Sequence, residues 1–182
     1  MEIFAVIIKM LWLMLPAYLS NPAAAISVAK TGTGKPIDFG KFYKNKRILG
    51  DGKTYKGLFS GIFFGIFIAI LQNFINKLFL NESMPQFNYA SIITLPVGAM
   101  LGDLTASFFK RRLGLTRGQS FPLVDQLDFV AGAWIFTIIF SNAWFQKNFS
   151  LEIILTAIIL TPILHLIVNI IGYKIGISKE PW

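Results

Sequence analysis

Residues 57–80 read GLFSGIFFGIFIAILQNFINKLFL, and this stretch decides the fold class of the chain. A helix needs roughly 20 predominantly apolar residues to cross the hydrocarbon core of a membrane. Four more stretches of this kind occur, at residues 3–28, 90–109, 124–145 and 149–173. The sequence therefore predicts an all-α integral membrane protein with five transmembrane helices, in a single domain that covers residues 1–182.

The composition supports the same class. Of the 182 residues, 54% are hydrophobic and only 14% are charged, whereas a soluble domain carries about 25% charged residues. An ordinary soluble enzyme is therefore excluded, and so is a disordered tail, which needs low hydrophobicity. The absence of cysteine excludes disulfides and thiol catalysis, and the single histidine argues against His-based catalysis.

The net charge of +8 is concentrated in alternate loops. In a membrane protein, clusters of lysine and arginine mark cytoplasmic loops or bound phosphate, so no nucleic-acid partner is expected. The connections after the second and fourth spans hold only Glu82 and Lys147. The positive-inside rule predicts an external N-terminus, a cytoplasmic C-terminus and cytoplasmic loops at about 29–56 and 110–123. The basic residues are Lys30, Lys35, Lys41, Lys44, Lys46, Arg47, Lys53 and Lys56, then Lys110, Arg111, Arg112 and Arg117, then Lys174 and Lys179.

The first span has an alternative interpretation as a signal peptide, because Lys9 and an apolar stretch precede small residues at 23–25. The weakly charged start, with Glu2, favours a retained helix instead.

Small residues recur at four-residue spacing, a pattern that lets membrane helices approach closely. Packing within the bundle is the simpler interpretation, although the same stripes permit a homodimer. They are Gly57, Gly61 and Gly65, then Gly98, Gly102 and Ala106.

Asp103 lies inside the third span. An intramembrane carboxylate costs about 2.5–3.5 kcal/mol on insertion scales and is a functional hypothesis by default. Helical spacing places Ser107 and Lys110 on nearly the same face, with Arg111 adjoining. The alternative is a structural ion pair between Asp103 and Lys110 within the bundle.

Asp125 and Asp128 open the fourth span at a spacing that projects both to one side of a helix. With Asp103 they supply oxygen ligands of the kind that magnesium takes together with substrate phosphates. For Asp125 alone, an N-terminal helix cap is the alternative.

The first basic loop contains Asp38 and then Leu-Gly-Asp-Gly-Lys-Thr at residues 49–54. Its Gly-Lys-Thr resembles the end of a P-loop, but Arg47 stands where that motif requires glycine. A glycine-rich turn before a helix is still expected to hold phosphate through backbone N–H groups. His165, by contrast, is expected to be a packed residue with no role.

Carboxylates that suit magnesium and basic residues that suit phosphate, in a membrane protein, fit phosphoryl chemistry, which depends on positioning and charge stabilisation. A phosphate monoester is anionic near neutral pH, because its second pKa is about 6, and so it needs no strong base. A lipid phosphate that attacks a nucleotide fits, and two metal ions could clamp the attacking and leaving oxygens.

Residues 102–111 read GDLTASFFKR and are followed by Gly114, Pro122 and the box Asp-Gln-Leu-Asp at 125–128. This pattern resembles the signature of CTP:phosphatidate cytidylyltransferases, without the His-Gly-Gly run, with Gln126 for the usual Arg, and with a shorter Pro-to-Asp spacing. Leu-Pro-Ala-Tyr at 15–18, Asn21, Pro-Ile-Asp at 36–38 and the 49–54 block resemble the archaeal branch, the CDP-archaeol synthases, along essentially the whole chain.

The resemblance implies transfer of CMP from CTP to the isoprenoid ether lipid 2,3-bis-O-geranylgeranyl-sn-glyceryl phosphate, with release of pyrophosphate. It also implies a Mg²⁺ cofactor and a polar pocket that opens to the cytoplasm from the archaeal plasma membrane. The implied catalytic residues are Asp103, Asp128 and Lys110, the metal ligands Asp103, Asp125 and Asp128, and the substrate-binding residues Asn21, Asp38, Asp51, Lys53, Thr54, Ser107 and Arg111.

Two other functions remain open from the sequence. A CDP-alcohol phosphotransferase requires Asp-Gly-x-x-Ala-Arg, but Asp51-Gly52 is followed by Lys-Thr-Tyr-Lys. A small ion-coupled transporter could use Asp103 and Asp128 as coupling sites, although the paired repeats common in transporters are not evident.

Overall fold

The computed structural model describes residues 2–32, 34–116 and 118–177, so Arg117 and Lys179 lie outside the described residues. Five of its helices are long and apolar enough to cross a membrane, which confirms the all-α membrane fold. The elements in chain order are α1 (Glu2–Thr31), β1 (Phe42–Tyr43), β2 (Lys46–Arg47), α2 (Tyr55–Phe79), α3 (Tyr89–Arg112), α4 (Val124–Asn148) and α5 (Leu151–Lys174).

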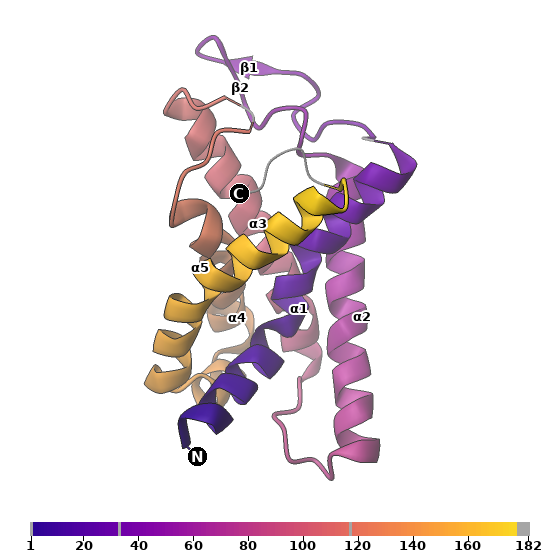
Figure 1. Cartoon of the computed structure of the whole chain (residues 1–182), viewed down its shortest axis with the longest axis vertical. Coiled ribbons are helices and arrows are strands. Elements are labelled where there is room, and N and C mark those ends of the chain that lie inside the picture. Colours follow the sequence, from indigo (N-terminus) through magenta and orange to yellow (C-terminus); the bar gives the residue numbers. More distant parts are fainter. Residues whose placement is uncertain (1, 33, 117, 178–182) are drawn as a thin grey trace.

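Successive helices run in opposite directions, so the connections alternate between the two ends of the molecule (Figure 1). One end carries the β1–β2 hairpin, the α3–α4 connection and the last turn of α5, and we call it the basic end. The start of α1 and the other two connections lie at the opposite end (Figure 1). This arrangement matches the predicted alternation of basic loops, whereas the orientation across a cell membrane stays a prediction.

Short polar side chains set the starts of three helices. Thr54 accepts a hydrogen bond from the backbone N–H of Gly57 at the start of α2. Asn88 and Ser150 cap α3 and α5 in the same way. Each cap satisfies an N–H group that the first helical turn leaves without a partner. The helices therefore begin close to the predicted span boundaries.

Helices α3 and α4 meet through glycine. A Cβ atom placed on Gly102 would lie 2.2 Å from the backbone oxygen of Asp128, and one on Gly132 would lie 2.2 Å from the backbone oxygen of Gly98. Only glycine allows backbones to approach so closely. The predicted use of Gly98 and Gly102 for packing within the bundle is confirmed.

The glycines of α2 are used in the same way. A Cβ atom on Gly65 would lie 2.8 Å from the backbone oxygen of Pro16, and one on Gly61 would lie 2.7 Å from that of Ser20. Because both stripes pack inside one chain, they give no support to a homodimer, which stays a prediction.

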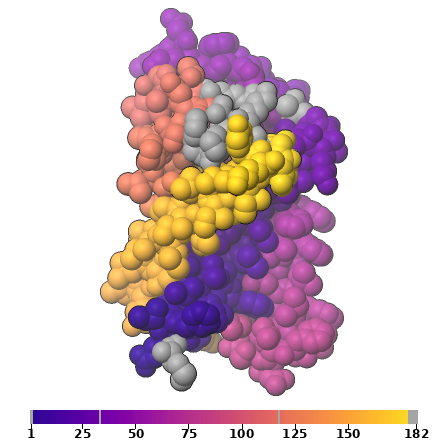
Figure 2. Space-filling model, viewed as in Figure 1, coloured from indigo at the N-terminus to yellow at the C-terminus, as the bar shows by residue number. Residues whose placement is uncertain are grey.

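Helix α5 crosses α1 obliquely on one face of the molecule (Figures 1 and 2). Its buried residues are Ile153, Ala157 and Thr161. The Thr161 hydroxyl lies 2.7 Å from the Tyr18 hydroxyl of α1, so a polar contact joins the two helices. Ten large apolar side chains of α5 are exposed, as expected for a helix that faces lipid.

Candidate active site

Lys53 and Asp103 form an ion pair near the basic end. The Lys53 ammonium lies 2.7 Å from Oδ1 and 2.5 Å from Oδ2 of Asp103. Lys53 comes from the loop just before α2, whereas Asp103 lies within α3. Both side chains are mostly buried, with exposed fractions of 27% and 21%. The pair therefore joins the two sequence blocks that were predicted to form a site.

Asp128 stands beside this pair on α4. The α3–α4 contact at Gly102 brings the backbone of Asp128 next to that of Asp103. Asp103 and Lys53 both act electrostatically on the Asp128 carboxyl group. Within the described residues, this carboxylate accepts a hydrogen bond from the backbone N–H of Phe129 and has no cation within ion-pair distance. We call Lys53, Asp103 and Asp128 the helix cluster.

Lys110 and Asp125 form a neighbouring ion pair, with the ammonium 2.9 and 2.7 Å from the two carboxylate oxygens. The alternative pairing of Asp103 with Lys110 is therefore wrong. Seven residues separate those two along α3, a rise of about 10 Å, which the lysine cannot span while it reaches α4. Asp125 also accepts from the backbone N–H of Phe121 at 2.9 Å. The N-cap alternative for Asp125 is wrong as well, since Leu123 occupies that position.

The carboxylates that the structure brings together suit a magnesium ion only in part. The described residues contain no group of three or more His, Cys, Asp or Glu side chains placed to hold an ion. Asp103 and Asp128, on adjacent helices, fit an ion that takes a few carboxylates and completes its shell with phosphate oxygens and water. Asp125 is paired with Lys110 much as Asp103 is paired with Lys53, and it also accepts from the backbone of Phe121, so its part as a metal ligand stays a prediction.

Asp38 is the centre of a second group of charges, in the loop between α1 and α2. Its side chain has no exposed surface. It accepts hydrogen bonds from the Arg47 guanidinium at 2.8 and 3.3 Å and from the backbone N–H groups of Gly40, Leu49 and Gly50 at 3.0, 3.0 and 2.9 Å. Arg47 also pairs with Asp51 at 2.6 Å. We call Asp38, Arg47 and Asp51 the loop cluster.

The loop cluster fixes the ionisation of Asp38. Burial raises the pKa of this carboxyl group, but the hydrogen bonds from Arg47, Gly50, Leu49 and Gly40 outweigh burial and hold the pKa well below its usual range. Because these partners stabilise the charged form, the carboxylate stays ionised and ties the turn together.

Several backbone amides in and beside the glycine-rich turn already have partners. Those of Leu49 and Gly50 donate to Asp38, that of Lys53 donates to the Gly50 carbonyl at 3.2 Å, and that of Tyr55 donates to the Lys35 carbonyl at 3.1 Å. These four amides are not open to phosphate, and the expectation that the turn holds phosphate through backbone N–H groups stays a prediction. The side chain of Lys53 is what this turn delivers to the helix cluster.

The other predicted substrate residues lie around these clusters. Ser107 is buried on α3, one turn from Asp103 toward the basic end. Thr54 is buried and serves as the cap of α2. Asn21 is half-buried on α1 and makes no side-chain hydrogen bond within the described residues.

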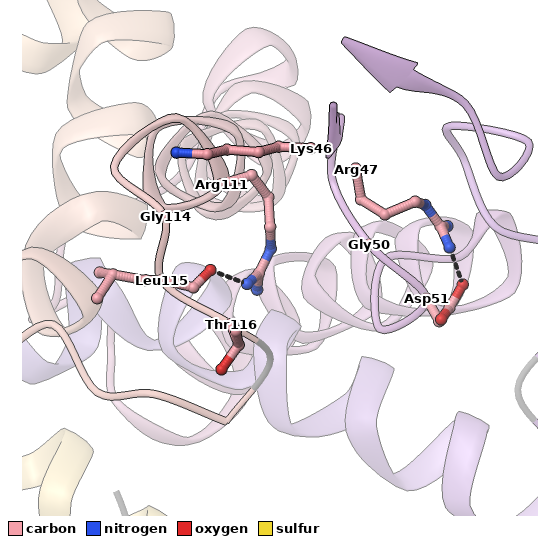
Figure 3. A pocket seen from close by; sticks show the side chains of 8 residues that line it. All are labelled: Lys46, Arg47, Gly50, Asp51, Arg111, Gly114, Leu115 and Thr116. Atoms are coloured by element: carbon pink, nitrogen blue, oxygen red, sulfur yellow. Dashed lines mark hydrogen bonds and ion pairs between the residues drawn. The ribbon is translucent and has the colours of Figure 1, made fainter. Parts of the chain in front are cut away.

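A cleft of about 300 Å³ opens at the surface of the basic end. Figure 3 shows Arg111 of α3 on one wall and the Arg47–Asp51 pair on the other. Arg111 donates to the Leu115 carbonyl and, at 3.4 Å, to the Leu49 carbonyl. The cleft is lined by Lys46, Arg47, Gly50, Asp51, Arg111, Gly114, Leu115 and Thr116.

The roles of Arg47 and Arg112 were not predicted from the sequence, where both residues only contributed to the positive charge of the cytoplasmic loops. Arg47 stands four residues from Asp51, a spacing that could have indicated their pairing. Arg112 donates to the carbonyls of Tyr43 and Arg47 at 2.6 and 2.5 Å, and Lys46 donates to the Arg112 carbonyl at 3.0 Å. These contacts attach the hairpin to the end of α3, so the wall of the cleft is fixed.

Known proteins are similar to this chain in sequence and in fold. Residues 3–182 match the family described as CarS-like, CDP-archaeol synthase. The CDP-archaeol synthase of Methanosarcina acetivorans is 55% identical, over 93% of this chain and 100% of that protein. That of Methanococcoides burtonii is 46% identical over the same shares. A solved structure of an intramembrane enzyme for archaeal membrane lipids biosynthesis aligns with a TM-score of 0.69 at 32% identity, and covers 90% of this chain and 94% of its own.

Proposed function

The chain belongs to the CDP-archaeol synthase family, and from that premise we propose that its helix cluster carries the reaction. The protein is a CTP-dependent lipid cytidylyltransferase of archaeal membrane lipid biosynthesis. It transfers CMP from CTP to 2,3-bis-O-geranylgeranyl-sn-glyceryl phosphate and releases pyrophosphate. The substrates in this proposal are CTP and an isoprenoid ether lipid phosphate.

One observation carries the assignment to this site. Lys53 of the glycine-rich loop, Asp103 of α3 and Asp128 of α4 converge although the three residues are remote in sequence. Two carboxylates and a lysine brought together by membrane helices are costly to bury, and such groups mark sites for ions or charged substrates. A nucleotide triphosphate near the membrane surface supplies such a ligand.

The reaction forms one bond and breaks another at phosphorus. An oxygen of the lipid phosphate attacks the α-phosphorus of CTP, and the bond from that phosphorus to the bridging oxygen of pyrophosphate breaks. The lipid phosphate is largely dianionic near neutral pH, so no residue has to remove a proton. The protein's task is to position two anions and offset their repulsion.

Side chains around the helix cluster suit that task. Lys53 and Lys110 are cations held in place by Asp103 and Asp125. Ser107 adds a hydroxyl on the same helix as Asp103. In the proposal, Asp103 and Asp128 hold magnesium, which supplies charge neutralisation at the triphosphate when it is bound. Asp51 and Arg111 line the surface cleft, where they are placed to meet the rest of the nucleotide.

The basic end is proposed to face the cytoplasm, where CTP is available, from the archaeal plasma membrane. The positive-inside distribution of lysine and arginine supports this orientation. The same face then receives CTP from water and the lipid phosphate from the leaflet.

The test incubates membranes that contain the protein with labelled CTP, magnesium and the geranylgeranylated glyceryl phosphate, with phosphatidic acid as a competitor. We expect label in the lipid fraction and release of pyrophosphate. CMP release would instead indicate a phosphotransferase, and ion flux without nucleotide turnover would indicate a transporter.

An Asp103→Asn variant locates the reaction within the protein. We expect it to accumulate in membranes at the wild-type level and to lose at least about 100-fold in CMP transfer, a typical loss when a group that stabilises transition-state charge is removed. Near-normal transfer by this variant contradicts the assignment of the helix cluster.

A further inference from the structure

The inward-facing stripe of α5 becomes polar as it approaches the basic end. Ile153, Ala157 and Thr161 are buried and spaced four residues apart, which places them on one face. The same spacing continues with His165 and Asn169, which are half-buried. Polar residues at these positions in a membrane helix require a partner or a function.

His165 faces the helices that carry the carboxylates. Its ring stacks on the buried ring of Phe129 on α4, with centroids 6.3 Å apart and an interplanar angle of 24°. Phe129 directly follows Asp128 in the sequence. Asp125 and Asp103 are both near enough to act electrostatically on the imidazole. The ring therefore lies beside the helix cluster, on its α5 side.

Asn169 determines which ring nitrogen is free to bind a ligand. Its amide nitrogen lies 3.2 Å from Nδ1 of His165. An amide nitrogen can only donate, so Nδ1 accepts and the ring proton of the neutral imidazole resides on Nε2. Within the described residues this Nε2–H has no hydrogen-bond acceptor. A fixed donor therefore stands near the helix cluster without a protein partner.

The surroundings of this donor fit a lipid better than a water-soluble ligand. Helix α5 lies across one face of the molecule over α1 (Figure 2). Between Thr161 and Asn169 its polar side chains are all on the inward stripe. The residues flanking His165 are apolar and open to the membrane. They are Ile163, Leu166, Ile167 and Val168, with exposed fractions of 54%, 44%, 47% and 44%.

We propose that His165 is a binding residue for the acceptor lipid, with its Nε2–H donating to the lipid phosphate. Asn169 is a positioning residue that fixes the ring. The apolar flank of α5 receives the long chains of the same molecule. This inference rests on the proposed function, because it assigns one substrate of that reaction to α5 and leaves CTP to the loop side of the helix cluster.

The test separates the two substrates kinetically. A His165→Phe variant keeps an aromatic ring for Phe129 but removes the donor, whereas His165→Gln restores an N–H donor at similar reach. We expect His165→Phe to raise the KM for the lipid phosphate by about tenfold or more, since a hydrogen bond to a charged group is lost. The KM for CTP should change by less than about twofold, and His165→Gln should recover most of the lipid affinity.

A control variant and a direct binding assay separate lipid binding at His165 from the proposed CMP transfer. Ile70→Phe adds a ring at an exposed position of another helix, α2, where Ile70 is 53% exposed, and should leave both KM values unchanged. Binding of labelled lipid phosphate to the solubilised protein without CTP tests the site independently of CMP transfer. If wild type binds the lipid more tightly than His165→Phe but transfers no CMP, the inference stands and the proposed function fails.

Two results overturn the inference. One is an unchanged affinity of His165→Phe for the lipid phosphate, in kinetics and in direct binding. The other is an equal rise of both KM values together with a lower melting temperature, which would show that His165 only supports the packing of α5 against α4.

Discussion

The loop cluster and the helix cluster contain the same kinds of groups but satisfy them differently. Asp38 accepts hydrogen bonds from Arg47 and three backbone amides, and its side chain has no exposed surface. Asp128 accepts within the described residues from one backbone amide and stands beside a second carboxylate, Asp103. A carboxylate with every lone pair occupied holds structure, whereas one with spare acceptor capacity can bind a ligand.

Asp38 and Asp51 have different surroundings in the first loop. Asp38 and Asp51 were both predicted to bind substrate or shape its pocket, and neither prediction has been tested. The structure gives Asp38 the partners of a folding residue and places Asp51, whose side chain is 64% exposed, on the cleft. The loop cluster thereby holds Lys53 where it meets Asp103.

The largest effect on the loop is expected from Asp38→Asn. This change removes the charge that five hydrogen bonds stabilise, and the loss should be about 2–3 kcal/mol of loop stability. Trypsin cleavage within residues 41–47 should therefore accelerate by roughly 30- to 150-fold, if opening of the loop precedes cleavage. Limited proteolysis in membranes measures this rate.

Asp51→Asn is the matched control, because it breaks the other ion pair of Arg47 at an exposed position. Exposed pairs contribute about 1 kcal/mol or less, so cleavage should accelerate by no more than about fivefold. Equal sensitivity of the two variants contradicts the central place of Asp38.

A smaller effect is expected at the contact that places Asp103 beside Asp128. In Gly102→Ala the new methyl group meets the backbone oxygen of Asp128 at 2.2 Å, so α3 and α4 must separate. Overpacking of this kind costs about 1–3 kcal/mol. CMP transfer should fall by about tenfold, and the melting temperature of the solubilised protein should fall with it.

Gly57→Ala provides the control for Gly102→Ala. Its methyl group meets its nearest neighbour, the Thr54 hydroxyl oxygen, at 3.3 Å. We expect CMP transfer within about twofold of wild type, since a small adjustment accommodates this contact. Wild-type transfer and melting in Gly102→Ala would show that the close approach of α3 and α4 does not set the helix cluster.

The smallest effect concerns pH. The pKa of Asp38 is held below its usual value in the folded loop, so the unfolded loop binds more protons as the pH falls. The stabilisation is therefore complete above about pH 4 and is lost only as the pH falls from there through the folded pKa. Hydrogen exchange of the peptide that spans residues 38–51, corrected for intrinsic rates, should show constant protection between pH 7 and about pH 4.5. Loss of protection between pH 6 and 5 contradicts the assigned pKa direction.

The sequence predicted the spans well because apolar length and polar caps act locally. Residues 124–145, for example, were expected to be helical, and α4 covers Val124–Asn148. Which lysine pairs with which aspartate could not be predicted from the sequence. Lys53 meets Asp103, and Lys110 meets Asp125, because of how α2, α3 and α4 pack. The turn around Asp38 was also not predicted. Phe39 adopts the left-handed conformation there at φ 51°, next to Gly40 at φ 78°, and a phenylalanine in the sequence does not indicate that conformation.

The most direct test of the difference between the clusters applies two assays to Asp128→Asn. Lipid labelling from CTP reports on chemistry, and tryptic cleavage of residues 41–47 reports on the loop. We predict that Asp128→Asn loses at least about 100-fold in labelling while its loop is cleaved at the wild-type rate. Near-wild-type labelling by Asp128→Asn, at wild-type levels in the membrane, would contradict the assignment of the reaction to the helix cluster.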